Sequence, residues 1–149
     1  MEWRERLIDD EAGIAALLAE TRRVAVLGIK TEAQVGQPAY YVPRYLRDAG
    51  VEVVPVPVYY PDATEILGAP VYRTVASVPG PIDIVDVFRR PVDLPAHLDD
   101  LLEAQPKAVW LQSGIRHEDV ARALAEAGIL VVQDRCLMID WRRFGPRPG

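Results

Sequence analysis

The chain has 149 residues, of which 50% are hydrophobic and 26% charged, and its formal net charge is −5. This length suits one domain with a full core, and the acidic balance argues against nucleic acid as a partner. No apolar run is long enough to cross a bilayer and no basic-then-apolar leader is present, so we expect a cytoplasmic protein without membrane association. The single cysteine, Cys136, cannot form an internal disulfide and belongs to no zinc-binding motif.

The first 50 residues contain the pattern of a phosphate-binding turn. Apolar positions among the charges of residues 1–21 predict an amphipathic helix that packs on the domain. Residues 23–27 then form an apolar strand that ends at Gly28 in a polar loop, and residues 38–50 fit a helix, because proline is tolerated in a first turn. The N-terminus of a helix offers free backbone N–H groups and partial positive charge to an anion. We therefore expect a ligand that carries phosphate.

The rest of the chain alternates between strand-like and helix-like segments. Residues 51–58 form a second apolar run whose prolines should weaken strand pairing near its end, and residues 59–81 indicate an ordered loop with a helical piece near 74–78. Further strands are predicted at 82–88, 108–111 and 129–132, with helices at 94–104 and 117–127. The sequence predicts an α/β fold, with a Rossmann-like, doubly wound parallel sheet of about five strands and helices on both faces, over residues 22–141 before a loose tail at 142–149.

The first turn lacks the features of a dinucleotide-binding site. Such a site normally shows G-x-G-x-x-G and an acidic residue about 20 positions later, at the end of the second strand. Here Gly28 is followed by Ile29 and Lys30, and no acid stands at residues 58–60. A Walker-type phosphate loop is also missing, because no Gly-Lys-Ser/Thr closes the turn. The pattern disfavours NAD and suggests that Lys30 neutralises a phosphate directly.

Several segments together resemble a known family. They are residues 23–28, 38–50, 54–57, 65–72, 82–91, 107–114 and 134–137, and the most specific parts are Asp-Val-Phe-Arg-Arg-Pro at 86–91 and Trp-Leu-Gln-Ser-Gly at 110–114. Over about residues 22–140 the chain resembles the small bacterial CoA-binding proteins, a family similar to the N-terminal domain of the succinyl-CoA synthetase alpha subunit. The resemblance implies a Rossmann-like domain that binds coenzyme A at the C-terminal edge of the sheet, with no established reaction of its own.

The resemblance also implies where the ligand lies. Residues 28–37 would hold the CoA phosphates, and residues 88–91 would line the pocket after the third strand. Two segments depart from the family pattern: residues 58–61 read Val-Tyr-Tyr-Pro where members commonly have Val-Asn-Pro, and residues 29–31 replace a small serine. Arginines can fork onto a phosphate, and aromatic rings can stack on adenine. The expected binding site consists of Gly28, Ile29, Lys30, Thr31, Gln37, Pro38, Val58, Tyr59, Phe88, Arg89 and Arg90.

Some of these residues also have a structural interpretation. Lys30 could be a solvated loop lysine, although its position at a strand end favours phosphate binding. One of Arg89 and Arg90 is expected to form a salt bridge with Asp86 or Asp83, which leaves the other for the ligand. The order of the strand ends alone does not decide between the two arginines.

The sequence leaves three classes of function open. The favoured one is a non-catalytic protein that binds coenzyme A or an acyl-CoA as its small-molecule ligand. The alternatives are a partial acyl-CoA synthetase or transferase subunit that acts with a partner chain, and a nicotinamide-dinucleotide-binding sensor. Neither His97 nor His117 stands in a triad-like pattern, and Cys136 is expected to be buried and inert rather than disulfide-bonded to CoA. Apolar positions in the first helix permit a homo-oligomer.

Overall fold

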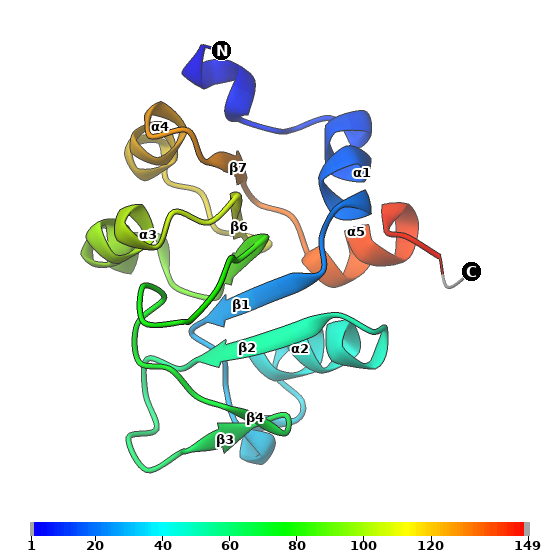
Figure 1. Ribbon diagram of the computed structural model, residues 1–149, viewed down its shortest axis with the longest axis vertical. Helices are drawn as coiled ribbons and strands as arrows, with labels where there is room; N and C mark the ends of the chain where they lie inside the picture. The colour runs from blue at the N-terminus through cyan, green and yellow to red at the C-terminus, as the bar shows by residue number, and fades with distance from the viewer. Residues whose placement is uncertain (1, 148–149) are drawn as a thin grey trace.

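A five-stranded parallel sheet forms the centre of the structure, a computed structural model that describes residues 2–147 (Figure 1). Its strands are β1 (Arg23–Leu27), β2 (Glu52–Val56), β5 (Ile84–Val87), β6 (Ala108–Leu111) and β7 (Leu130–Val132). They lie in the order β2-β1-β5-β6-β7, and each neighbouring pair is parallel. The predicted Rossmann-like α/β fold is confirmed. Without the short hairpin β3–β4, the order is the 2-1-3-4-5 arrangement of doubly wound sheets.

Helices cover both faces of the sheet. The helices α1 (Glu11–Ala19), α2 (Pro38–Asp48) and α5 (Leu137–Phe144) lie on one face, and α3 (Leu98–Ala104) and α4 (Glu118–Glu126) lie on the other (Figure 1). Within residues 2–147 there are also three short 3-10 helices. η1 (Trp3–Arg6) precedes α1, η2 (Glu32–Gln34) precedes α2, and η3 (Pro91–His97) precedes α3. The side chains of consecutive strand residues alternate between the two faces, so each strand contributes to both hydrophobic clusters.

The N-terminal segment differs from the single helix expected over residues 1–21. It forms η1 and α1 with an extended piece between them, and Met1 lies outside the described residues. In that piece Ile8 N donates a hydrogen bond of 2.8 Å to Val131 O, which ties the segment to β7. Asp10 then accepts a bond from Gly13 N and caps α1, so the helix starts only after the chain has crossed the sheet edge.

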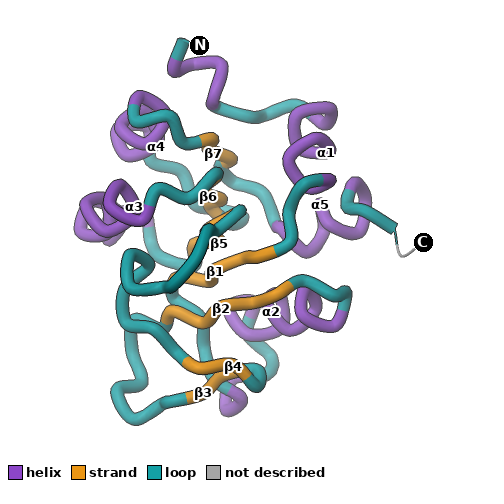
Figure 2. Tube along the Cα trace, in the orientation of Figure 1, coloured by secondary structure: helices purple, strands orange, loops and turns teal. Residues whose placement is uncertain are grey.

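Residues 59–81 hold a hairpin that the sequence pattern did not indicate. Its strands β3 (Glu65–Ile66) and β4 (Ala69–Pro70) lie beside β2 (Figure 2). The helical piece expected near 74–78 is a turn instead. The carboxylate of Asp100 accepts bonds from Val75 N (2.8 Å) and Ala76 N (2.9 Å), so these donors are satisfied by α3 rather than by a helix of their own.

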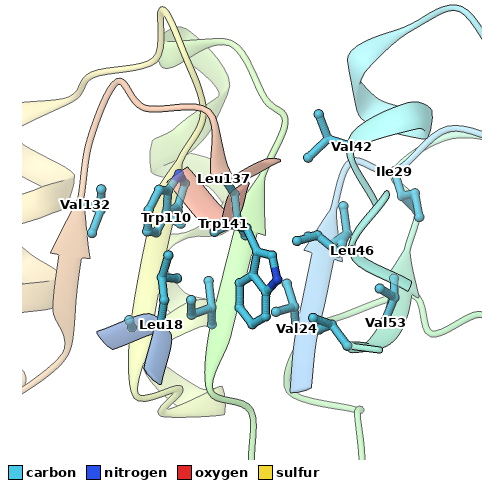
Figure 3. Close-up of a cluster of buried hydrophobic side chains, with 14 of the residues drawn as sticks. Leu18, Val24, Ile29, Val42, Leu46, Val53, Trp110, Val132, Leu137 and Trp141 are labelled. Carbon is cyan, nitrogen blue, oxygen red and sulfur yellow. The ribbon is translucent and has the colours of Figure 1, made fainter. Parts of the chain in front are cut away.

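Helix α5 is a second element that was not predicted. Its last turn contains residues 142–144, which were expected to belong to the tail, while residues 148–149 lie outside the described part of the chain. Leu137 and Trp141 are buried and stand one turn apart on its inner side. Figure 3 shows both side chains among residues from the sheet and from α2. Leu137, Trp141 and Phe144 stand at the spacing i, i+4 and i+7, so an apolar helical pattern was present in the sequence, although it extends over only eight residues.

Pro55 does not interrupt the pairing of β2, although weaker pairing was expected near the end of that strand. The ladder with β1 continues through Val56, because Pro55 faces the open side of an edge strand. Its carbonyl accepts a hydrogen bond of 3.0 Å from Tyr72 N on that side. The missing N–H of Pro55 therefore removes no hydrogen bond between β2 and β1.

Candidate functional site

Two adjoining cavities open at the C-terminal edge of the sheet, where β1 and β5 end side by side. Doubly wound sheets bind ligands at this point, because the connections after the two strands lead away in opposite directions. The larger cavity has a volume of about 620 Å³ and extends toward β6 and α5. The smaller one, of about 220 Å³, lies between the turn after β1 and the segment after β2. Four residues line both cavities and form what we call the shared wall: Lys30, Phe88, Arg89 and Arg90.

Gly28 allows the turn after β1 to lie against β5. Its φ angle is +88°, and a Cβ atom at this position would lie 2.4 Å from the carbonyl oxygen of Phe88. A side chain is therefore excluded both by the left-handed backbone and by the contact. Gly28 N donates to Val56 O at 2.9 Å and Phe88 N donates to Leu27 O at 2.9 Å, so the turn is held from both neighbouring strands.

The shared wall carries three cationic side chains. Lys30 takes part in none of the ion pairs of residues 2–147. The Arg89 side chain is 16% exposed and its guanidinium lies 5.6 Å from the centre of the Tyr59 ring. The Arg90 side chain is 78% exposed. An anion at the junction of the two cavities would thus contact cations that differ in exposure and in the number of their protein partners.

The salt bridge expected for the arginines forms with a different partner. Asp93, rather than Asp86 or Asp83, lies 2.9 Å from Arg90 Nε and 3.7 Å from Arg89 Nη2. The 3-10 turn η3 brings Asp93 back under the two arginines, at spacings of three and four residues. Asp83 instead accepts hydrogen bonds from the backbone of residues 22 and 23 at the opposite edge of the sheet. One carboxylate therefore serves two guanidinium groups, and the wall keeps net positive charge.

His97 holds Arg89 in place. Arg89 Nε donates to His97 Nε2 at 3.1 Å, which requires that nitrogen to carry a lone pair. Burial, and then the charge of Arg89, lowers the pKa of His97 below its usual value of 6.5. The imidazole is therefore neutral at physiological pH and acts as a hydrogen-bond acceptor.

The smaller cavity has aromatic sides. Tyr59 is 65% exposed, and its ring packs edge-to-face on Tyr60 with 6.5 Å between the ring centres. Arg73 holds this segment by donating to four backbone carbonyl groups, those of Tyr59, Tyr60, Pro61 and Ala63, over 2.8–3.2 Å. The loop after β2 is thus fixed by one side chain from beyond the hairpin, a relation that the sequence pattern did not reveal.

The N-terminus of α2 contributes less to anion binding than its sequence suggests. Gln37 is the N-cap but makes no capping bond with its side chain, and Pro38 has no N–H group. Tyr40 N and Tyr41 N both donate to the Gln37 carbonyl at 2.9 Å. In the described chain this leaves Ala39 N as the free donor of the first turn, beside the larger cavity.

The far end of the larger cavity is formed by β6 and α5. Gln112 follows β6, is 4% exposed and lines the cavity, and its Oε1 accepts a bond of 2.9 Å from Leu137 N at the start of α5. Trp110 Nε1 donates to Arg135 O at 2.7 Å, and Arg135 pairs with Asp140 in the first turn of α5. These bonds fix the start of α5 against the end of β6.

The structure places ten of the eleven expected site residues around the two cavities. Thr31 does not line either one; its hydroxyl bonds to Gln34 and caps η2. The binding roles of all eleven stay predictions. Pro91, which was expected to line the pocket with residues 88–90, lines the larger cavity. The lining residues that were not expected are Ala39, Tyr41, Val42, Tyr60, Gln112, Ser113, Gly114, Ile115, Cys136, Met138 and Ile139. The segment after β6 could have been found, because strands of a parallel sheet end at the same edge.

Asp86 lies in β5, two residues before Phe88 of the shared wall. It is fully buried on the face of β5 that also carries Phe88, beside Val26 and Trp110 of the neighbouring strands. Neither carboxyl oxygen has a hydrogen-bond partner in the described structure, and burial raises the pKa of this group well above 3.8. An unpaired carboxyl group thus lies in the core between β1 and β6, where it costs stability.

Two classes of site are not found in the described part of the chain. Residues 2–147 contain no cluster of three or more histidine, cysteine or acidic side chains that could hold a metal ion. Within the same range, each helix is too short or too polar to span a bilayer.

Comparison with known proteins finds a matching family and a relative. Residues 22–142 match the family model described as CoA binding domain. The uncharacterized protein YneT of Bacillus subtilis is 33% identical over 129 residues, which cover 87% of this chain and 92% of YneT.

Solved structures show the same fold. The structure titled cell-free ID.343 from Thermus thermophilus has 42% sequence identity and a TM-score of 0.83, with 91% of this chain and 99% of that chain covered. A dinucleotide-forming acetyl-coenzyme A synthetase 1 from Ca. Korarchaeum cryptofilum has 20% identity and a TM-score of 0.66, over 79% of this chain and 26% of that one. At this low identity the second similarity shows the fold alone.

Proposed function

Because the chain belongs to the CoA-binding domain family, we propose that it is a non-catalytic protein that binds coenzyme A or an acyl-CoA at the C-terminal edge of the sheet. The observation that carries this proposal is the shared wall. Its cations stand between a small aromatic cavity and a larger, mostly apolar one. Coenzyme A has the matching order of parts, with phosphates between an adenine ring and a pantetheine arm.

Each part of the ligand has a chemically suitable place. Tyr59 offers an exposed ring for adenine in the smaller cavity. Lys30 and Arg89 supply the positive charge for phosphates, together with Ala39 N at the start of α2. The pantetheine arm would extend along Tyr41 and Val42 toward β6, and apolar side chains of this kind line most small-molecule sites.

The two alternative functions have weaker support. NAD binding normally uses an acid at the end of the second strand for the ribose, and here β2 leads to Val58 and Tyr59 instead. A role as a synthetase subunit would need groups from a partner chain, and the likeness to the acetyl-CoA synthetase is one of fold. Both stay hypotheses.

Calorimetric titration of the ligand-stripped protein with coenzyme A, dephospho-CoA and NAD tests the proposal. We expect saturable binding of coenzyme A, and weaker binding without the 3′-phosphate, because a cation of the shared wall then loses a partner. We expect no heat with NAD, because it has neither the 3′-phosphate nor a pantetheine arm for the larger cavity, and no acid follows β2 to bind its ribose. Binding of NAD without binding of coenzyme A would reject the proposal and favour the sensor. Turnover of an acyl-CoA by the pure chain would reject the non-catalytic part alone.

A further inference from the structure

The end of the larger cavity at β6 and α5 presents hydrogen-bond donors without acceptors. Gln112 Oε1 accepts from a backbone N–H, which only an oxygen can do, so the orientation of the amide is fixed and its NH2 group is the free half. In residues 2–147 that NH2 group donates to no protein atom. In this range, the side-chain oxygens and nitrogens that are fully buried and have no hydrogen-bond partner are the two oxygens of Asp86. Gln112 Nε2 has no partner either, so it is not fully buried and is open to the cavity that Gln112 lines.

The first turn of α5 adds two further donors beside this amide. Leu137 N is used by Gln112, and Asp140 N donates to Cys136 O at 3.0 Å. In the described chain Met138 N and Ile139 N have no acceptor, and both residues line the cavity. The N-terminus of a helix favours partial negative charge. The one acid in this turn, Asp140, is neutralised by Arg135, so it does not cancel that effect.

We propose that these three groups form a carbonyl-binding subsite, and that the cellular ligand is a CoA thioester whose acyl carbonyl lies against Gln112 Nε2 and the start of α5. This inference rests on the proposed function and names the ligand within it. A thioester offers a carbonyl acceptor and no N–H donor. That matches a subsite of donors only, because Gln112 Oε1 is already occupied. An amide of the pantetheine arm would leave its own N–H unpaired there, at a cost in free energy.

The position of the subsite fits the far end of the ligand. The cations of the shared wall follow β1 and β5, whereas Gln112 follows β6 and α5 comes after β7. Neighbouring strands are roughly 4.8 Å apart, so the subsite lies on the order of 10 Å from the turn after β1. The larger cavity, which contains this subsite, is also lined by apolar side chains, among them Val42, Phe88 and Met138. The acyl group at the end of the pantetheine arm can therefore be placed at this subsite, and the ligand comparison below separates it from the amides of the arm.

The test compares three ligands that differ in one group: acetyl-CoA, free CoA and S-ethyl-CoA, a thioether with a methylene in place of the carbonyl. Titration of the wild-type chain should show acetyl-CoA bound roughly five- to twentyfold more tightly than S-ethyl-CoA, as expected for one or two hydrogen bonds. Equal affinities for these two ligands would overturn the subsite while leaving the CoA-binding proposal intact. Failure of all three to bind would reject the proposed function itself.

Gln112→Glu locates the effect. A glutamate keeps the acceptor for Leu137 N and replaces the NH2 donor with a negatively charged oxygen. Its charge repels the phosphates of every CoA ligand alike, whereas the lost donor affects the carbonyl alone, so the ratio of the affinity for acetyl-CoA to that for S-ethyl-CoA should fall about tenfold. Gln133→Glu is the matched control, because Gln133 Oε1 also accepts from a backbone N–H, that of His117 at 2.8 Å, outside both cavities. An equal loss for acetyl-CoA, CoA and S-ethyl-CoA in Gln112→Glu would assign Gln112 to the pantetheine amides and overturn the proposal.

Discussion

The two edges of the sheet differ in how their polar groups are used. At the N-terminal edge, Arg23 Nε pairs with Glu52 at 2.6 Å, Asp83 accepts from the backbone N–H groups of Arg22 and Arg23, and Lys107 pairs with Glu20. At the C-terminal edge, Lys30 takes part in none of the ion pairs of residues 2–147, and the NH2 group of Gln112 has no protein acceptor there. The N-terminal edge pairs these groups within the protein, whereas the C-terminal edge leaves these donors without a protein acceptor.

Apolar side chains show the same asymmetry. The exposed large hydrophobic residues of the described chain all follow the C-terminal end of a strand: Val35, Val58, Tyr59, Val92 and Ile139. Three of them, Val58, Tyr59 and Ile139, line the two cavities, and exposed apolar residues at a cavity are typical of a binding site. Polar groups are thus paired within the protein at the N-terminal edge, whereas unpaired donors and exposed apolar residues lie at the C-terminal edge, where we propose that the ligand binds.

The largest expected effect concerns the backbone of the C-terminal edge. Gly28→Ala should lower the free energy of unfolding by about 2–4 kcal/mol, because the left-handed conformation and the contact with the Phe88 carbonyl both oppose a Cβ atom. Denaturant unfolding measures the loss. Gly36→Ala, with no atom within 4 Å of its Cβ position, is the control and should change stability by less than about 1 kcal/mol. Equal effects would mean that the close approach of the turn is unimportant.

The two lysines of the chain give the sharpest test of the comparison, since one lies at each edge. Lys30→Ala should weaken coenzyme A binding roughly tenfold to a hundredfold, the value of a charge-assisted hydrogen bond, with little change in melting temperature. Lys107→Ala should leave the affinity unchanged, because its ammonium pairs with Glu20 at the opposite edge. Calorimetry measures both. A smaller loss for Lys30→Ala than for Lys107→Ala would place the ligand elsewhere.

Asp86 and Asp140 are both buried, but only Asp140 has a cationic partner, Arg135. The raised pKa of Asp86 means that the folded protein keeps a proton that the unfolded chain loses above about pH 3.8, so stability should fall as pH rises from there toward the folded-state pKa. Asp86→Asn should remove this slope and stabilise the fold at pH 7 by about 1–3 kcal/mol.

Asp140→Asn provides the contrast for Asp86. It breaks a charge-assisted bond and should destabilise the protein by about 1.5–3 kcal/mol at pH 7. Thermal unfolding followed from pH 3 to pH 8 measures both variants. If Asp86→Asn destabilised the fold at pH 7, the carboxyl group would have a partner in solution that the structure does not contain.

The smallest expected effect comes from His97. Its lowered pKa means that the unfolded chain takes up a proton below pH 6.5 before the folded protein does, so His97 costs stability progressively as pH falls below that value. Protonation would also end the bond from Arg89 Nε. His97→Gln keeps an acceptor and does not titrate, so its stability should fall less between pH 6.5 and pH 5, as judged by melting temperature. An identical decline in wild type and variant would show that His97 does not carry this pH dependence.

Much of the fold could be predicted because its signals are local. The apolar runs of β1 and β5 and the proline-initiated helix α2 each mark an element within a few residues. The hairpin β3–β4 could not be predicted, since two-residue strands carry no periodic signal. Helix α5 was missed because its apolar pattern at Leu137, Trp141 and Phe144 extends over only eight residues. The same limit applied to Asp93, which meets Arg89 and Arg90 only because η3 folds back under them.

From local sequence features we could predict a phosphate-bearing ligand and the edge of the sheet at which to expect it. Gly28, the absence of an acid after β2 and the residues of the third strand end are local facts, and a parallel sheet brings its strand ends to one edge whatever the details of packing. Which donors at this edge have no protein acceptor depends on the tertiary structure. Pairing depends on neighbours from distant parts of the chain: Glu20 occupies Lys107, Leu137 occupies one half of Gln112, and no carboxylate of residues 2–147 forms an ion pair with Lys30.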